Sequence, residues 1–95
     1  MSGLLSPAEV QSQLATLTDW ILEGNTLQTT LSFKGFIEAV EFVNQVVAPA
    51  EAAGHHPDLA ISYNKVTISL STHDLGGLTQ QDFDMARTLS TLIKE

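Results

Sequence analysis

The feature that most constrains this chain is a run of alternating side chains on both sides of Asn64-Lys65. Large apolar residues occupy positions 59, 61 and 63 and then 66, 68 and 70, with small or polar residues between them. Alternation with a period of two predicts a β-hairpin, and Asn tolerates the positive φ that a two-residue turn requires. In this register Tyr63 faces Val66, and the six large apolar residues share one face of the hairpin.

The same register has a consequence for the residues that flank the hairpin. Extended outwards, it places Asp58 opposite Ser71 and His56 opposite His73. Directly opposed Cβ atoms in such a ladder lie roughly 4.5–5.5 Å apart, although Pro57 frays the pairing, so we expect neighbours and not a fixed distance. The sequence therefore predicts that its three histidines, the third being His55, gather at one end of the hairpin.

The remaining elements place the hairpin in an α+β fold. A helix opens at Ser6-Pro7-Ala8-Glu9 with a capping box, strands are expected at 20–23 and 26–33, a helix runs from about 35 to 54, and a last helix opens at Thr79. The order αββαββα predicts a four-stranded antiparallel sheet with three helices packed on one face. A chain of this length forms one domain, residues 1–95.

The second helix carries three further expectations. Its apolar residues are spaced to form one buried stripe, made of Phe36, Val40, Val43 and Val47. Pro49 removes a backbone donor, so we expect a kink or a break there. Gly54 suits the left-handed position at the C-terminal end.

Composition excludes several classes of function. The net charge is −7, and the four basic residues are scattered among eleven acidic ones, which argues against direct binding to nucleic acid or to an anionic membrane. The chain has no cysteine, which fits a reducing compartment, and no apolar run approaches a membrane span or a signal peptide. We therefore expect a cytoplasmic protein.

Three converging histidines suit proton transfer, because the ordinary pKa of imidazole lies near physiological pH. A metal site is the competing interpretation, but the chain offers no thiolate and no recognised zinc spacing. Glu51, one helical turn before His55, either orients an imidazole or is a solvated carboxylate. Asp82 is interpreted as a helix cap that reaches back to Thr79. Trp20 and Tyr63 are interpreted as core aromatic residues.

These residues together resemble a known signature. Glu51, His55-His56-Pro57, Tyr63, His73 and Asp82 match the pattern of the pterin-4a-carbinolamine dehydratases. The likeness extends through Tyr-Asn-Lys-Val, Leu-Ser-Thr-His and Gly-Leu-Thr-x-x-Asp, and upstream to Phe33-Lys34-Gly35-Phe36. The chain departs from the family pattern at Gly35, where Asp is frequent, at Leu59, where an aromatic is frequent, and at Pro49.

The resemblance implies a hydro-lyase that converts a 4a-hydroxytetrahydropterin to quinonoid dihydropterin and water without cofactor or metal. It implies His55, His56 and His73 as catalytic residues and favours a supporting role for Glu51. We expect the flat substrate to bind beside them, at Gly54, Ser71, Thr72 and Asp74. It also implies that the protein is a homodimer or homotetramer. The implied pathway is tetrahydrobiopterin recycling, with an aromatic amino acid hydroxylase as a neighbour in the pathway. Two alternatives stay open: a dimerisation cofactor for a homeodomain transcription factor, and a pterin-binding relative in molybdenum cofactor metabolism.

Overall fold

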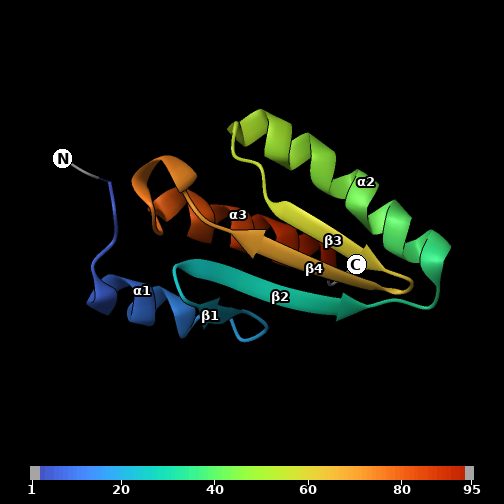
Figure 1. The fold of residues 1–95 in the computed structure, drawn as a ribbon, viewed down its shortest axis with the longest axis horizontal. Helices are drawn as coiled ribbons and strands as arrows, with labels where there is room; N and C mark the ends of the chain where they lie inside the picture. The colour runs from blue at the N-terminus through green and yellow to red at the C-terminus, as the bar shows by residue number, and fades with distance from the viewer. Residues whose placement is uncertain (1–2, 94–95) are drawn as a thin grey trace.

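The protein, seen here as a computed structural model that describes residues 3–93, has the predicted α+β fold. The elements are α1 (Pro7–Leu14), β1 (Ile21–Glu23), β2 (Thr26–Ser32), α2 (Phe36–Ala53), β3 (Asp58–Ser62), β4 (Lys65–Leu70), a short 3₁₀ helix η1 (His73–Leu75) and α3 (Gln80–Ile93). The four strands form one antiparallel sheet in the order β1-β2-β4-β3, so β1 and β3 are its edges. In Figure 1, α3 lies behind the strands, with α2 along the β3 side and α1 near β1.

The core lies between the sheet and the helices. Leu27 of β2, Ile68 of β4 and Phe83 of α3 are completely buried there. Trp20 is also a core residue, as predicted, since it is 3% exposed. Its indole Nε1–H donates to Ser90 Oγ at 2.9 Å, which satisfies the one polar group that the ring buries.

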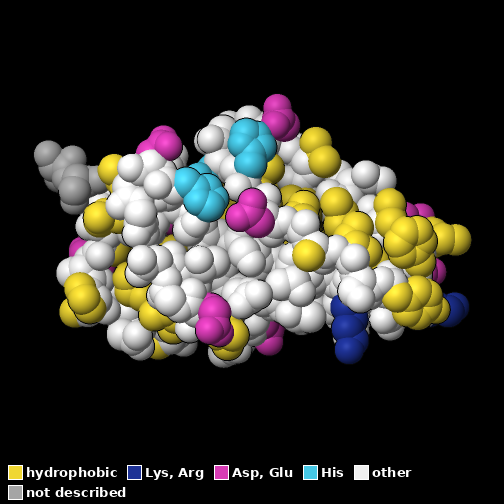
Figure 2. Space-filling view, in the orientation of Figure 1, with side chains coloured by type: hydrophobic (Ala, Val, Ile, Leu, Met, Phe, Trp, Pro, Cys, Tyr) yellow, Lys and Arg dark blue, Asp and Glu magenta, His cyan; other side chains and the backbone are white. Residues whose placement is uncertain are grey.

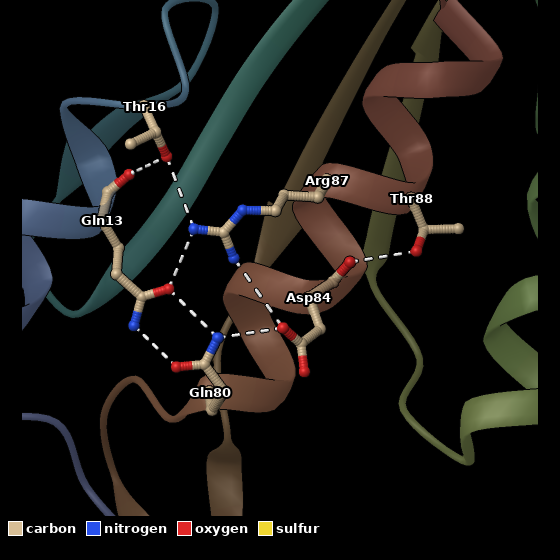
Figure 3. Close-up of polar contacts among 6 residues, drawn as sticks. All are labelled: Gln13, Thr16, Gln80, Asp84, Arg87 and Thr88. Atoms are coloured by element: carbon tan, nitrogen blue, oxygen red, sulfur yellow. Dashed lines mark hydrogen bonds and ion pairs between the residues drawn. The ribbon is translucent and has the colours of Figure 1, made fainter.

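Polar contacts fix α1 at its start and along its side. The predicted capping box is present: Glu9 N–H donates to Ser6 Oγ and Ser6 N–H donates to Glu9 Oε1. The backbone N–H of Ser6, and then its hydroxyl, hold the pKa of the Glu9 carboxyl below its usual value. Farther along, Gln13 bonds Gln80 at 2.7 Å and accepts from Arg87 at 3.0 Å (Figure 3). These bonds attach α1 to α3.

The β3–β4 turn is formed by Tyr63-Asn64, so the predicted register was wrong by two residues. Ser62 pairs with Lys65, and Tyr63 takes a positive φ of 54°. The physical reason lies outside the hairpin: Phe33 N–H donates to the Asn64 carbonyl at 2.7 Å, and the Asn64 amide donates back to the Phe33 carbonyl at 2.9 Å. These two bonds hold Asn64 against the end of β2 and thereby fix the turn.

A shift of two residues preserves the faces of the strands but changes their partners. Leu59 now pairs with Ile68 on the core side, as the alternation predicted. Tyr63 moves into the turn and is 68% exposed, so its interpretation as a core aromatic was wrong. Asp58 pairs with Ser69 and not with Ser71, and the predicted pairing of His56 with His73 is therefore wrong too.

The buried stripe of α2 is also not the predicted one. The helix buries Ala39, Phe42, Val46 and Ala50 against the core. Phe36 and Val47 of the predicted stripe are more than half exposed, and Val40 and Val43 are half-buried. Pro49 does not break the helix, which continues to Ala53.

Candidate functional site

The three histidines meet at the end of the sheet opposite the β3–β4 turn. They contribute to a hollow of about 280 Å³ whose lining comes from the end of α2, the segment after β4 and the first turn of α3. In Figure 2, histidine side chains lie close to acidic ones on this part of the surface. All seven residues predicted to be catalytic or substrate-binding line the hollow, together with one that was not predicted: Gly54, His55, His56, Ser71, Thr72, His73, Asp74 and Gln81.

The end of α2 determines where His55 lies. Gly54 adopts the left-handed conformation, with φ 64° and ψ 28°, as its position in the sequence predicted. Its N–H bonds the carbonyls of Ala50 and Glu51, and the N–H of His55 bonds the Ala50 carbonyl at 3.2 Å. This is the Schellman type of helix end, which reverses the chain within one residue. It directs His55 towards the start of α3.

At the start of α3, His55 meets a buried carboxylate. Its Nε2 lies 2.5 Å from Asp82 Oδ1, and Asp82 is completely buried. The other oxygen, Oδ2, accepts from the Thr79 N–H at 2.9 Å and from the Thr72 hydroxyl at 2.8 Å. An ionised carboxylate only accepts hydrogen bonds, so an ionised Asp82 places the proton of a neutral His55 ring on Nε2 and leaves Nδ1 as the acceptor.

The interpretation of Asp82 as mainly a helix cap was incomplete. The predicted bond from Thr79 N–H is present, but the same carboxylate also holds an imidazole of the hollow. Local spacing gave no sign of this, because the two residues are 27 positions apart. The one available signal was the presence of Asp82 in the family signature.

His56 and His73 have carboxylate partners of their own. Glu51 Oε2 lies 2.6 Å from His56 Nε2, so Glu51 contacts an imidazole as one of the two interpretations expected. Asp58 Oδ2 lies 3.6 Å from His73 Nε2. All four side chains are more than 60% exposed, and ion pairs of this kind contribute little stability, about 0–1 kcal/mol. These two carboxylates therefore matter for the orientation of the His56 and His73 rings and not for the stability of the fold.

The segment that carries His73 is a closed loop. Thr72 N–H donates to the Gly77 carbonyl at 2.8 Å, and the N–H groups of Leu75 and Gly76 return to the Thr72 carbonyl at 3.0 Å. Gly76 takes the left-handed conformation, with φ 70°, that ends η1. The loop thus holds His73 beside the end of α2 without help from the β3–β4 ladder.

Within residues 3–93, no three His, Cys, Asp or Glu side chains converge as the ligands of a metal ion would. No helix in the same range has the length and apolarity needed to span a bilayer.

Comparisons with known proteins place the chain in one family. A sequence model of the family described as pterin 4 alpha carbinolamine dehydratase matches residues 3–92. A Trichormus variabilis protein whose name places it in that family is 62% identical over 92 residues, which cover 97% of this chain and 99% of the relative. A similarly named Roseiflexus castenholzii protein is 48% identical over 93 residues, covering 98% of this chain and all of the relative.

Solved structures show the same fold. A crystal structure described as a transcriptional coactivator/pterin dehydratase from Brucella melitensis superposes with a TM-score of 0.88 at 32% identity, over 94% of this chain and 97% of that one. A pterin dehydratase-like protein described as a RuBisCO assembly factor of the alpha-carboxysome shares the fold alone, with a TM-score of 0.62 at 20% identity over 77% of this chain and 84% of its own. On the family match and the close relatives, this chain belongs to the pterin-4a-carbinolamine dehydratase family of hydro-lyases.

Proposed function

We propose that the hollow at the end of α2 dehydrates a 4a-hydroxytetrahydropterin by histidine acid–base catalysis. One observation carries the proposal: three imidazoles line a single hollow, and the Nε2 of each faces its own carboxylate. A carboxylate behind an imidazole fixes the tautomer and stabilises the imidazolium that forms during proton transfer. The arrangement supports a site that both gives and takes a proton.

The reaction asks for two proton transfers and no change of oxidation state. An imidazolium gives a proton to the hydroxyl on C4a, the C–O bond breaks, and water leaves. A neutral imidazole removes the proton from N5, whose electrons form the new C=N bond of the quinonoid dihydropterin. His55, His56 and His73 supply the acid and the base, and one positioned group of this kind typically contributes about 10²–10⁴-fold to the rate.

The rest of the hollow suits a flat, polar heterocycle. Ser71, Thr72 and Asp74 follow β4 and line the hollow together with His73. The exposed Asp74 carboxylate is an acceptor, which the ring N–H groups of a pterin require. We assign the substrate to the class released by an aromatic amino acid hydroxylase, in tetrahydrobiopterin recycling. No metal or cofactor is needed for this chemistry, and a cytoplasmic location stays a prediction.

The test is the decay of 4a-hydroxytetrahydropterin absorbance, followed with and without the purified protein. We expect the wild type to accelerate the decay, and the triple variant His55→Ala, His56→Ala, His73→Ala to return it to the uncatalysed rate. Single substitutions measure how far one imidazole replaces another. Circular dichroism establishes that each variant is folded. A folded triple variant with full activity would place the chemistry elsewhere.

We also propose that the protein is a homo-oligomer. Several large apolar side chains of α2, β3 and the β3–β4 turn are exposed: Phe36, Ile37, Val47, Ile61 and Tyr63. Figure 2 shows hydrophobic side chains gathered where α2 begins and the hairpin turns. Next to them β3 is an open sheet edge. Apolar patches and open edges on small domains are commonly covered by a second copy. Light scattering at micromolar concentration tests this: we expect Val47→Glu to dissociate the oligomer, whereas Gln45→Glu on the same helix leaves it intact.

A further inference from the structure

We infer that Thr72 is a positioning residue, whose hydroxyl sets the orientation of the Asp82 carboxylate and, through it, of His55. The inference rests on the proposed function for its kinetic consequences only. Its structural content concerns the bonds that Thr72 makes. Thr72 was expected to bind the substrate, and the structure commits its side chain to a different task.

The hydrogen of the Thr72 hydroxyl is already in use. Thr72 Oγ1 donates to Asp82 Oδ2 at 2.8 Å, and it lies 2.9 Å from Thr79 Oγ1. A hydroxyl has a single hydrogen, so the Thr79 hydroxyl must be the donor between the two threonines. The chain of donors therefore runs from Thr79 to Thr72 and then to the carboxylate. The Thr72 hydroxyl has no hydrogen left for a substrate.

These bonds fix the carboxylate in its plane. Oδ2 is held from two sides, by the Thr72 hydroxyl and by the Thr79 N–H at 2.9 Å, and Oδ1 is thereby presented to His55. Asp82 is 0% and Thr79 is 6% exposed, so water does not reach the carboxylate as a substitute donor while a side chain of the same shape fills the place of Thr72. A rotation of the carboxylate would lengthen the 2.5 Å contact with His55 Nε2.

Thr72 also links two histidines that belong to different segments. Its main-chain groups close the loop that carries His73, through bonds to Gly77 and Gly76, while its side chain reaches Asp82. The positions of His55 and His73 are thus coupled through one residue. That coupling replaces the strand pairing of histidines that the sequence had predicted.

The test compares Thr72→Val, which removes the hydroxyl and keeps the shape, with Thr72→Ser, which keeps the hydroxyl. Thr67→Val is the matched control. Thr67 lies on β4, the strand that leads to the site, and its hydroxyl, like that of Thr72, lies close to another threonine hydroxyl: the distance to Thr30 Oγ1 is 3.2 Å. The first readout needs no substrate: the NMR signal of the proton on His55 Nε2, assigned by its absence in His55→Gln. A short bond to a carboxylate shifts such a proton far downfield and slows its exchange with water.

We expect the signal to broaden or vanish in Thr72→Val and to persist in Thr72→Ser and Thr67→Val. We also expect kcat to fall about tenfold in Thr72→Val with little change in KM, and to recover in Thr72→Ser, as for an interaction made in the transition state. Should Thr72→Val not fold, Thr72→Ala takes its place in both measurements.

An unchanged His55 signal in a folded Thr72→Val protein would overturn the inference, whatever the activity of the enzyme. If the wild-type protein shows no dehydratase activity and Thr72→Val still loses the His55 signal, the positioning role stands and only the proposed function is refuted. A rise in KM at constant kcat, with the His55 signal intact, would return Thr72 to substrate binding.

Discussion

Replacing Asp82 by asparagine is the sharpest single test of the site. The substitution conserves shape and removes one charge. The carboxylate accepts three hydrogen bonds, from His55 Nε2, the Thr72 hydroxyl and the Thr79 N–H. An amide has one acceptor oxygen and one donor NH₂ group, so it satisfies the donors on one side only.

Both orientations of the asparagine amide are unfavourable. With its oxygen towards Thr72 and Thr79, its NH₂ meets His55 Nε2 and forces the ring into the other tautomer, which leaves no acceptor on Nδ1. With its oxygen towards His55, two buried donors lose their acceptor, at about 1–3 kcal/mol for each unsatisfied group. The first orientation costs less, and in it the imidazole is held in the wrong tautomer.

We therefore expect Asp82→Asn to lower turnover by about 10²–10⁴-fold, the range seen when a histidine loses its carboxylate partner or its acid–base role. We expect the free energy of unfolding to fall by about 1–3 kcal/mol, because hydrogen bonds to a charged carboxylate are replaced by weaker bonds to a neutral amide. A loss of each kcal/mol lowers Tm by roughly 4–8 °C in a domain of this size. Turnover is measured by the decay of 4a-hydroxytetrahydropterin absorbance and Tm by circular dichroism.

Asp84→Asn is the matched control. Asp84 lies on the same helix, its side chain is 66% exposed, and it contacts Gln80 and Arg87 but not the hollow. We expect it to leave turnover unchanged. If a folded Asp82→Asn protein turned over substrate as fast as Asp84→Asn, Asp82 would be a helix cap only, and the argument from the His55 tautomer would be refuted.

Three further results are expected. Glu51→Gln keeps an acceptor for His56 in an exposed pair, so turnover should fall by less than about tenfold with stability within about 0.5 kcal/mol of wild type, and a loss as large as that of Asp82→Asn would contradict this. Dialysis against a chelator should leave activity unchanged, whereas a loss that zinc restores would establish a metal enzyme. Arg87→Met removes one of the bonds to Gln13 that attach α1 to α3, so hydrogen exchange of the α1 amides should accelerate while turnover stays at the wild-type level; equal protection of α1 would mean that the Gln13–Gln80 bonds and the apolar contacts of Val10 suffice.

The hairpin illustrates what a sequence specifies well and what it does not. Alternation with period two identified the core face of β4, and on β3 it placed Leu59 against the core, although Ile61 of the same predicted face is 40% exposed. The faces survived a register error because the error was an even number of residues. The turn itself was set by a tertiary contact, the pair of bonds between Asn64 and Phe33. Local turn preferences cannot include a partner 31 positions away.

The prediction of the buried stripe of α2 was wrong for a different physical reason. Its apolar residues extend around more than one side, so its sequence is compatible with two stripes, one through Phe42 and Val46 and one through Phe36 and Val47. Small alanines at 39 and 50 allow the first stripe to approach the core closely. A helix that is apolar on two sides predicts two contacts, and the side that the monomer leaves exposed is the one we propose to be covered by a second copy.

The candidate site shows why residues can be predicted when their geometry cannot. The histidines were identified from their chemistry and from the family signature, and they do line one hollow, yet not through the strand pairing that was expected. They are brought together by two helix-end structures, the left-handed Gly54 that directs His55 and the loop closed by Thr72 that carries His73. Asp82 joins the two, because its carboxylate contacts both His55 and Thr72. A capping residue suits this connection because a backbone N–H holds one of its carboxylate oxygens in place, and the second oxygen is then available to orient an imidazole.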